Sequence, residues 1–353
     1  MKIGSKTIGK NNHTFIVAEL SANHNQKFDL AVKTIKAMKE SGADAVKFQT
    51  YTSDSLSLDV DDERFGPIKN GQWKGIRPYD LYKKAAMPWE WQSKLKKIAE
   101  KIGLLCFSSP FDFKAVDFLE TLGMPIYKIA SPEITDIPLI KYVASKGKPM
   151  IISTGLANID DIKLALKTCR DAGNDNISLL KCTSQYPAPI EAANLSTLID
   201  MKQRFGVDVG VSDHTFGSIV PVVAVSLGAK IVEKHFILDR KLDGPDSAFS
   251  MEPHEFKKMV DDIRLTEKAL GKMSYEIKEK DKQRRRSLFV TEYIKKGELL
   301  TDKNFRSVRP GHGLHPKYLY DVLGKKAKSD LKKGTPLKKD SMTPKINIRD
   351  IRS

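Results

Sequence analysis

Short apolar runs rich in β-branched residues recur along the first 270 positions, and amphipathic stretches separate them. The stretches between the runs, such as residues 29–43, repeat apolar residues at helical spacing and stop at a glycine or polar turn. A segment at 253–272 has the pattern of a final helix. The apolar runs predict eight strands, at 15–20, 45–50, 104–110, 126–131, 150–155, 177–182, 207–214 and 230–236.

Eight strands that alternate with helices predict an α/β fold of the (β/α)8 TIM-barrel type. A doubly wound open sheet is the alternative, but no GxGxxG follows the first strand. One connection, from Tyr51 to Trp91, is about forty residues long and holds all three tryptophans. Long connections in compact domains are usually functional or disordered, and the tryptophans argue against disorder throughout. We expect this segment to cover the catalytic mouth, with a purely structural insertion as the alternative.

The pattern changes after residue 272. Residues 1–272 are predicted to form the barrel, and the charged run 273–286 is predicted to be a linker. Residues 287–345 read as a small domain of short strands and turns, in which KKGELL and KKGTPL suggest two similar units. Residues 346–353 form the expected tail.

Charge and composition narrow the class of protein. Of the net +16, residues 273–353 carry +12, from 22 Lys and Arg against 10 Asp and Glu. Such a basic unit suits an anionic small molecule better than nucleic acid here, because no RNP, zinc-knuckle or finger spacing is present. Three cysteines make no disulfide framework, and no signal peptide or membrane-spanning run is found. We expect a cytoplasmic protein with no membrane partner.

Polar residues gather at the carboxyl ends of the predicted strands, where TIM barrels build their active sites. Lys47 and Lys128 interrupt apolar strands, where a charge is costly unless it is paired. Two lysines and several hydroxyl groups at one mouth suit a phosphate together with a carboxylate. The strand-end set is Glu19, Lys47, Gln49, Ser108, Ser109, Lys128, Ser131, Ser153, Thr154, Thr183, Ser184, Tyr186, Ser212, His214, Glu233 and His235.

His214 and His235 end the seventh and eighth predicted strands, which are neighbours in a barrel. Two imidazoles there can share a metal and leave positions open for substrate oxygens. Glu233 lies two residues before His235 and points to the same face of its strand, so we expect it to orient that histidine. One core histidine and one loop histidine is the alternative.

The motifs NHN (23–25), KFQTY (47–51), KIASPE (128–133), STG (153–155), CTSQYP (182–187), SDHT (212–215) and EKHF (233–236) resemble those of the sialic acid synthase family. The resemblance covers residues from about 10 to 345. It implies a barrel followed by a small antifreeze-like (SAF, β-clip) domain. It also implies a transferase that condenses phosphoenolpyruvate with an N-acetylated amino sugar.

The resemblance assigns roles by motif. It implies phosphoenolpyruvate binding by Lys47, Ser109, Lys128, Ser131, Ser153 and Ser212. It implies that His214 and His235 hold a divalent metal, Mn²⁺ or otherwise Mg²⁺ or Co²⁺. Glu19, Gln49, Tyr186 and Asp246 match the acceptor-sugar and catalytic environment, with Lys47 and Lys128 also catalytic. In a homodimer, Arg309, with Phe289 beside it, is expected to reach the partner's barrel and contact the acyl-amino group.

Further segments of the sequence bear on which amino sugar is the acceptor. The segments AELSANHNQ and LYKKAAMPWEW resemble those of the pseudaminic acid synthase branch, whose acceptor is 2,4-diacetamido-2,4,6-trideoxy-L-altrose. Ser184 stands where neuraminate synthases commonly have asparagine, which disfavours N-acetylmannosamine as the acceptor. N-acetylneuraminate and legionaminate synthases remain alternatives, as does a metal-dependent barrel hydrolase or aldolase or a non-catalytic carbohydrate-binding protein. Within the branch, the product is expected to serve flagellin glycosylation.

Overall fold

The computed structural model describes residues 1–3, 6–9 and 12–344. The chain divides into two compact units, Met1–Gly271 and Lys272–Ser353. The predicted tail, 346–353, and the last residue predicted for the second domain, 345, lie outside the described residues. No helix in the described residues is long and apolar enough to cross a membrane.

Eight parallel strands close into a barrel in the order β10-β3-β4-β5-β6-β7-β8-β9, which confirms the predicted TIM barrel and rules out the open sheet. Every predicted strand forms, and several end one or two residues earlier than predicted. The strands are β3 (Phe15–Glu19), β4 (Ala45–Thr50), β5 (Leu105–Pro110), β6 (Tyr127–Ile129), β7 (Met150–Ser153), β8 (Ile177–Cys182), β9 (Asp208–Asp213) and β10 (Ile231–His235).

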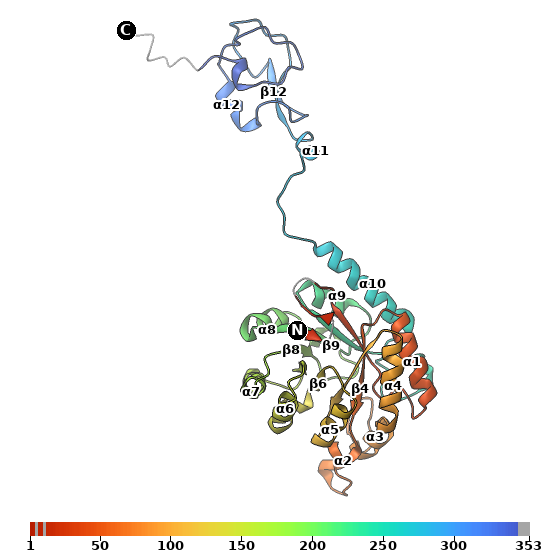
Figure 1. Ribbon diagram of the computed structural model, residues 1–353. Helices are drawn as coiled ribbons and strands as arrows, with labels where there is room; N and C mark the ends of the chain where they lie inside the picture. The colour runs from red at the N-terminus through yellow and green to blue at the C-terminus, as the bar shows by residue number, and fades with distance from the viewer. Residues whose placement is uncertain (4–5, 10–11, 345–353) are drawn as a thin grey trace. The chain divides into compact units, whose positions relative to one another are not determined.

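Helices surround the barrel (Figure 1), and their apolar faces pack on the outward side chains of the strands. Helix boundaries follow local capping chemistry. Asn158, for example, caps α7 (Ile159–Asp171) by accepting from the backbone N–H groups of Asp160 and Asp161, at 2.8 and 3.0 Å. The principal helices are α1 (Phe28–Glu40), α4 (Trp89–Lys101), α5 (Phe113–Thr121), α6 (Ile137–Ala144), α7 (Ile159–Asp171), α8 (Thr197–Phe205), α9 (Ile219–Ser226) and α10 (Pro253–Leu270).

The inside of the barrel is built in two layers. The lower layer is apolar, and the short hairpin of β1 (Lys2–Ile3) and β2 (Lys6–Thr7) adds to it through Ile3 and Ile8. Side chains along a strand alternate between faces, so the residue two positions farther along points into the same lumen. The lower layer comprises Phe15, Val17, Ala45, Phe107, Ile126, Ile151, Leu180 and Ile231. The layer above it is polar and buried, and comprises Glu19, Lys47, Ser109, Lys128, Ser153, Cys182, Ser212 and Glu233.

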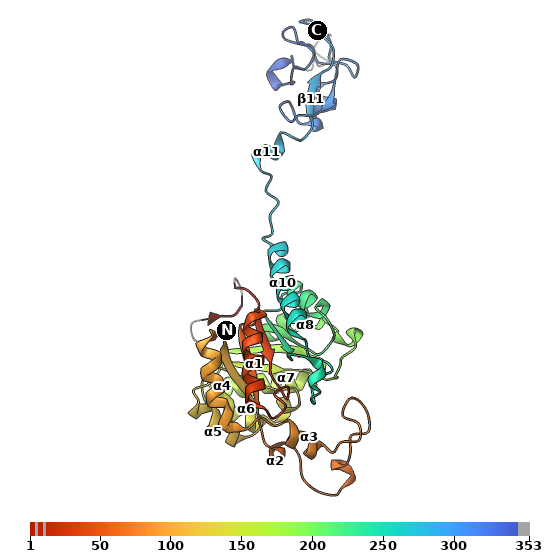
Figure 2. The ribbon, with the colours of Figure 1, turned by 90° about the vertical axis from the view of Figure 1, so that its right-hand side faces the viewer.

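The long connection after β4 carries α2 (Ser53–Leu56), a 3-10 turn at Glu63–Phe65, and α3 (Pro78–Ala85). In Figure 2 this connection leaves the barrel as an extended loop beside α2 and α3. The ends of the predicted cover belong to the barrel wall instead: Trp89 stacks on Phe118 at 4.9 Å, and Trp91 packs edge-on against Phe28 at 5.6 Å. The interpretation as a cover therefore applies to the middle of the segment.

The second unit has its own apolar core. Its two KKG turns have the same structure, because Gly297 and Gly334 both have positive φ, +86° and +87°, and Leu300 and Leu337 are both fully buried. The predicted pair of similar units is therefore present. The elements of this unit are α11 (Glu279–Lys282), β11 (Ser287–Val290), β12 (Phe305–Val308), α12 (Leu319–Val322), and 3-10 turns at Pro316–Tyr318 and Lys339–Ser341.

Candidate active site

The upper layer of the lumen is held together by one shared carboxylate oxygen. Oε1 of Glu233 accepts hydrogen bonds from Lys47 Nζ at 2.9 Å, from Lys128 Nζ at 2.8 Å and from Ser212 Oγ at 3.1 Å. Glu19 Oε2 lies 2.7 Å from Lys47 Nζ. All of these side chains are buried, so their charges compensate one another inside the barrel.

This clustering shifts the affinity of the groups for protons. Burial lowers the pKa of Lys47 to about 7, because Glu233 only partly offsets the loss of water and Lys128 adds repulsion. Burial alone would raise the pKa of Glu233, but Lys128 and Lys47 together hold it far below its usual range. Glu233 is therefore ionised, and Lys47 is near the point of losing its proton at neutral pH.

The prediction that Glu233 orients His235 is wrong. The Glu233 carboxylate is committed to the two lysines, and Nδ1 of His235 has no hydrogen-bond partner among the described residues. The carboxylate nearest to that nitrogen is Asp246, whose Oδ2 lies 3.9 Å away. The two inward residues of β10 point the same way, as expected, but serve different halves of the site.

The two histidines form the second half of the site. Their rings lie 5.2 Å apart, and Nδ1 of His214 is 2.9 Å from the carbonyl oxygen of Thr183. A carbonyl only accepts, so Nδ1 carries a proton, and the other ring nitrogen is the one that can hold a lone pair. Burial lowers the pKa of His214, but contacts with Cys182 and Thr183 outweigh burial and raise it above its usual value. Burial, with His214 and Lys47 nearby, lowers the pKa of His235 well below its usual value, so this ring is neutral.

These features fit a metal held by two imidazoles, since a neutral ring with an unused nitrogen is what such a site requires. No group of three or more His, Cys, Asp or Glu side chains suited to a metal occurs in the part of the chain that the structure describes. A metal bound here would therefore take the remaining ligands from water or substrate.

Aromatic rings line the histidine half. Tyr186 lies 4.4 Å from the ring of His214, and Phe249 lies 4.8 Å from the ring of His235. Trp73, from the middle of the long connection, is 5.5 Å from Tyr186. The middle of the predicted cover therefore contacts the aromatic rings of the site through Trp73.

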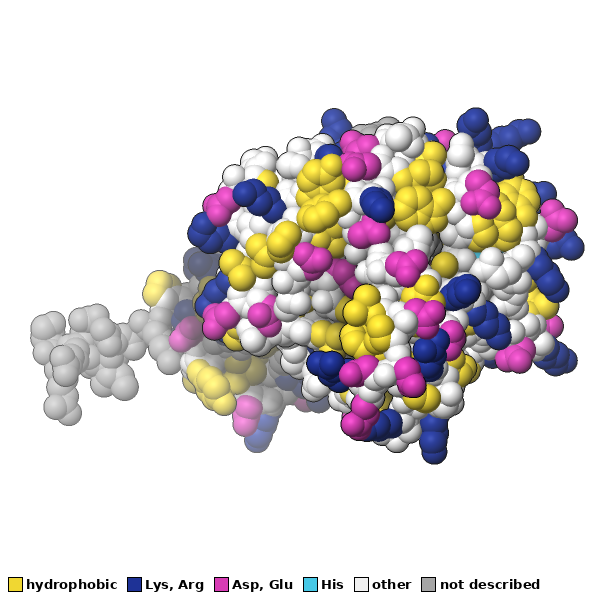
Figure 3. Space-filling model, turned by 90° about the horizontal axis from the view of Figure 1, so that it is seen from below, with side chains coloured by type: hydrophobic (Ala, Val, Ile, Leu, Met, Phe, Trp, Pro, Cys, Tyr) yellow, Lys and Arg dark blue, Asp and Glu magenta, His cyan; other side chains and the backbone are white. Residues whose placement is uncertain are grey.

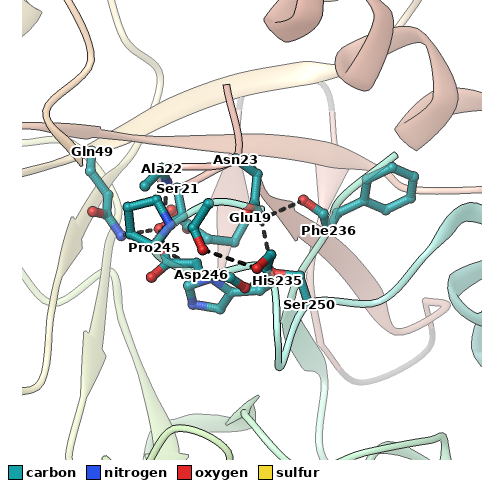
Figure 4. Close-up of polar contacts among 12 residues, drawn as sticks. Glu19, Ser21, Ala22, Asn23, Gln49, His235, Phe236, Pro245, Asp246 and Ser250 are labelled. Carbon is teal, nitrogen blue, oxygen red and sulfur yellow. Dashed lines mark hydrogen bonds and ion pairs between the residues drawn. The ribbon is translucent and has the colours of Figure 1, made fainter. Parts of the chain in front are cut away.

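A third group of contacts joins the loop after β3 to the loop after β10 (Figure 4). Ser21 donates to Asp246, and Gln49 Nε2 donates to Ser21 Oγ at 3.3 Å. Asn23 Nδ2 donates to the carbonyl oxygen of Phe236 at 2.9 Å. Burial raises the pKa of Asp246, although the hydrogen bond from Ser21 opposes this. These contacts join Gln49 to Asp246 through Ser21, and Asp246 Oδ2 lies 3.9 Å from Nδ1 of His235.

The predicted serines lie around the lysine half. Ser109 and Ser153 are buried, and their hydroxyl groups have no partner among the described residues. Ser131 Oγ accepts from the N–H of Gly155 at 3.1 Å. Ser184 crowds the same glycine, since a Cβ on Gly155 would lie 2.4 Å from Ser184 Oγ. A side chain at residue 155 would displace at least one of these two hydroxyl groups from its present position.

Two predicted site residues belong to the second unit and are described there alone. Phe289 is buried on β11, paired with Arg306 across the sheet, and Arg309 is exposed just after β12. Their expected role at a partner's barrel stays a prediction.

Buried polar atoms without a partner concentrate at this site. Of eleven such side-chain atoms without a hydrogen bond in the described residues, six belong to predicted site residues: both oxygens of Glu19, of which Oε2 is ion-paired with Lys47, one of Glu233, the hydroxyls of Ser109 and Ser153, and Nδ1 of His235. Unpaired buried polar groups are rare in folded proteins because each costs free energy. The site is therefore prepared to form hydrogen bonds and coordinate bonds that the protein itself does not supply.

Sequence reasoning missed Cys182. Its thiol contacts His214 and Ser131; burial raises its pKa, but these neighbours outweigh burial and lower it to about 7. Strand alternation could have found it, because Leu180 and Cys182 both point inward. Ser21, Asn23 and Phe249 were missed for another reason. They lie in loops, and loops have no periodic pattern from which the direction of a side chain can be predicted.

The fold and the site define a (β/α)8 barrel in which a buried cluster of lysines and carboxylates lies beside a pair of histidines. Residues 34–275 match the NeuB family and residues 285–341 match the SAF domain, so the chain belongs to the NeuB family, which confirms the resemblance found in the sequence. It is a phosphoenolpyruvate-dependent synthase of that family and a transferase.

Individual relatives match over nearly their whole length. The pseudaminic acid synthase of Campylobacter jejuni is 46% identical over 96% of this chain and 98% of its own. That of Helicobacter pylori is 47% identical over 93% and 97%. The crystal structure of spore coat polysaccharide biosynthesis protein SpsE from Bacillus subtilis is 35% identical, covers 97% of this chain and 99% of its own, and superposes with a TM-score of 0.68.

Proposed function

We propose that this protein catalyses the pseudaminic acid synthase reaction, in which phosphoenolpyruvate condenses with 2,4-diacetamido-2,4,6-trideoxy-L-altrose. The observation that carries the chemistry is the buried pair Lys47 and Lys128, which share one oxygen of Glu233. Even with Glu19 beside Lys47, both ammonium groups have N–H groups without an acceptor among the described residues. The high identity to pseudaminic acid synthases supports the acceptor. Membership of the NeuB family leaves the hydrolase, aldolase and non-catalytic alternatives without support.

In the proposed reaction, C3 of phosphoenolpyruvate attacks the aldehyde carbon of the open-chain sugar and positive character develops at C2. Water adds at C2, and the tetrahedral intermediate releases inorganic phosphate by C–O cleavage. Lys47 and Lys128 hold the carboxylate and phosphate, and the free hydroxyls of Ser109 and Ser153 orient them. Glu19 Oε2 lies 2.7 Å from Lys47 Nζ, but Oε1 has no hydrogen-bond partner in the described residues and is placed to take a proton from the water.

A divalent metal at His214 and His235 is part of the proposal, with Mn²⁺ as the first choice and Mg²⁺ or Co²⁺ as the others. When bound, it supplies Lewis acidity that makes the aldehyde carbon more electrophilic. The support is the proton position of His214 and the unused nitrogen of His235. Activity should be lost on treatment with a chelator and return with Mn²⁺, and direct binding of Mn²⁺ should be lost in His235→Gln.

The decisive assay is phosphate release with phosphoenolpyruvate, Mn²⁺ and three acceptors: the diacetamido-L-altrose, the legionaminic acid precursor and N-acetylmannosamine. We expect the altrose derivative to give the highest kcat/KM. A preference for N-acetylmannosamine would overturn the acceptor while leaving the chemistry intact. With ¹⁸O in the bridging position of phosphoenolpyruvate, the label should appear in phosphate, and label in the sugar acid would exclude C–O cleavage.

We further propose a homodimer in which Arg309 serves the partner's site. The support is the family resemblance at RPGHG and the exposure of Arg309. Mixing Arg309→Ala with Lys128→Met subunits tests it, because only a mixed dimer would then contain one intact site. Recovery of about a quarter of the wild-type activity supports contact across the dimer, and no recovery argues against it. The cytoplasmic location and the flagellin destination of the product stay predictions.

A further inference from the structure

The middle of the long connection is an ordered loop whose tip reaches the site. Ile68 and Ile76 pair through a backbone hydrogen bond of 3.0 Å, and Gly75 N–H donates back to Ile68 at 2.9 Å. The residues at the tip are Gln72 and Trp73, both partly buried. Viewed from below, where α2 and α3 lie in Figure 1, hydrophobic and acidic side chains occupy the middle of the surface and basic ones mostly its edge (Figure 3).

The tip is tied to the segment that carries Asp246. Nε1 of Trp73 and Nε2 of Gln72 both donate to the carbonyl oxygen of Pro245, at 2.7 and 2.8 Å. Pro245 directly precedes Asp246, which lies beside His235. Two side chains on one carbonyl fix the tip against the loop after β10.

The ring of Trp73 faces only the histidine half. It contacts Tyr186 at 5.5 Å and Phe249 at 6.5 Å, and each of these rings contacts both histidines. The lysine half, which is proposed to hold phosphoenolpyruvate, makes no ring or polar contact with Trp73 among the described residues. A molecule that meets the indole is therefore the acceptor.

Gln72 adds an unmet hydrogen-bonding group at the same place. Its Oε1 is buried and has no partner in the part of the chain that the structure describes, although its Nε2 is bonded to Pro245. A buried amide oxygen without a donor loses the hydrogen bond that water would give it. A ligand N–H placed here would restore that bond.

An aromatic face beside a free amide oxygen matches the chemistry of an acetamido group, which has an apolar methyl and a single N–H. The acceptor has two such groups, at C2 and C4, whereas N-acetylmannosamine has only the one at C2. Arg309 is already expected to contact one acyl-amino group, the one common to the family's acceptors. The C4 group is left without a recognition element.

We propose that Gln72 and Trp73 recognise the 4-acetamido group of the acceptor, the indole packing on its methyl and Gln72 Oε1 accepting its N–H. This inference rests on the proposed function, since it names the residues that select that acceptor. It makes the loop from 57 to 77 a specificity element and not a general cover.

The test compares two acceptors, the 2,4-diacetamido sugar and its analogue without the 4-acetamido group. Trp73→Ala should lower kcat/KM for the first by about 10- to 100-fold and leave that for the analogue within about threefold. Gln72→Leu should show the same pattern with a loss of about tenfold. The KM for phosphoenolpyruvate and the melting temperature should stay close to wild type in both.

Two control variants distinguish direct contact with the acceptor from structural support of the loop after β10. Lys74→Ala, an exposed neighbour in the same turn, should change neither acceptor. Trp73→Phe keeps a ring but loses the N–H to Pro245, and should retain most of the discrimination because Gln72 still holds the tip.

Equal losses with both acceptors in Trp73→Ala would overturn the inference, because they would show that the loop only supports Asp246. No loss with either acceptor would overturn it too. Failure of the wild-type protein to release phosphate with the diacetamido sugar is a different result, and it would refute the proposed function itself.

Discussion

The barrel buries lysines in two places, and the two environments differ in how completely they satisfy the charge. Inside the lumen, Lys47 and Lys128 share one oxygen of Glu233. On the outer face of β10, Lys234 donates to Asp213 Oδ2 at 2.5 Å and to the carbonyl oxygens of Thr215 and Gly217 at 2.5 and 3.3 Å. An ammonium group has three N–H donors, so Lys234 uses all of them.

The difference separates a structural charge from a functional one. Lys234 ties the segment that follows His214 to the strand beside it, and nothing in its surroundings calls for a ligand. Lys47 and Lys128 have N–H groups that are not hydrogen-bonded within the described residues. Nearby oxygens of Glu233, Ser109 and Ser153 also lack hydrogen-bond partners there. Burial alone, which is nearly complete for all three lysines, does not distinguish these cases. The count of unused donors and acceptors does.

The largest effect should come from removing a lumen lysine. Lys128→Met should lower kcat/KM for phosphoenolpyruvate by about 10³- to 10⁴-fold, because a charge that holds the anion is lost. Its stability should change little, since Glu233 keeps Lys47. Phosphate-release kinetics and a thermal melt on the same sample check both statements. A protein that melts far earlier would show that Lys128 is a structural residue instead.

Lys234→Met should have the opposite profile. It leaves Asp213 buried without its cation, which should reduce the free energy of unfolding by about 3–5 kcal/mol. The KM for phosphoenolpyruvate of the folded fraction should stay near wild type. In the double variant Lys234→Met/Asp213→Asn, part of the stability should return, and denaturant titration of the four proteins measures the coupling. Additive losses would mean that the pair does not act as a unit.

The binding of phosphoenolpyruvate should depend on pH through Lys47. The Lys47 ammonium has a pKa lowered to about 7, so it is charged below this pH and loses its charge as the pH rises. Since the charge binds the anion, kcat/KM for phosphoenolpyruvate should fall by up to about tenfold per pH unit above this value. Lys47→Arg keeps its charge at all accessible pH values, so kcat/KM of this variant for phosphoenolpyruvate should not show the same fall at high pH. An unchanged fall in that variant would assign it to another group.

The smallest effects are expected from substitutions of two neighbouring serines on β5, one facing the lumen and one facing outward. Ser109 points into the lumen with a free hydroxyl, whereas Ser108 points outward and is bonded to Thr50 Oγ1 at 2.6 Å. Ser109→Ala should raise the KM for phosphoenolpyruvate by about three- to tenfold without loss of stability. Ser108→Ala should cost about 1 kcal/mol of stability and leave the KM unchanged. Matching effects of the two variants on KM would contradict the distinction.

Much of this site could be predicted from the sequence because it follows strand alternation. Glu19, Lys47 and Glu233 occupy inward positions of recognisable strands, so periodicity alone placed them at one mouth. The pairing between them could not be predicted in the same way. Glu233 could have served either the histidine or the lysines, and only the distances across the lumen decide between them.

The contacts of the long connection were beyond sequence reasoning for a related reason. Trp73 was predicted to lie in a cover, but Trp89 and Trp91 shared that expectation and pack in the barrel wall. Nothing local distinguishes them, because the partner of Trp73 is Pro245, more than 170 positions away. Loops carry no period from which such a partner can be inferred.

Strand β10 places Glu233 and His235 on one face and Lys234 on the other. A shift of this strand by a single residue would bring Lys234 into the lumen and expel both of its neighbours. A deletion or duplication of one codon within β10 would therefore remove the anion cluster, one histidine and the structural ion pair together. This strand can change in evolution by substitution, but we expect its length to be fixed.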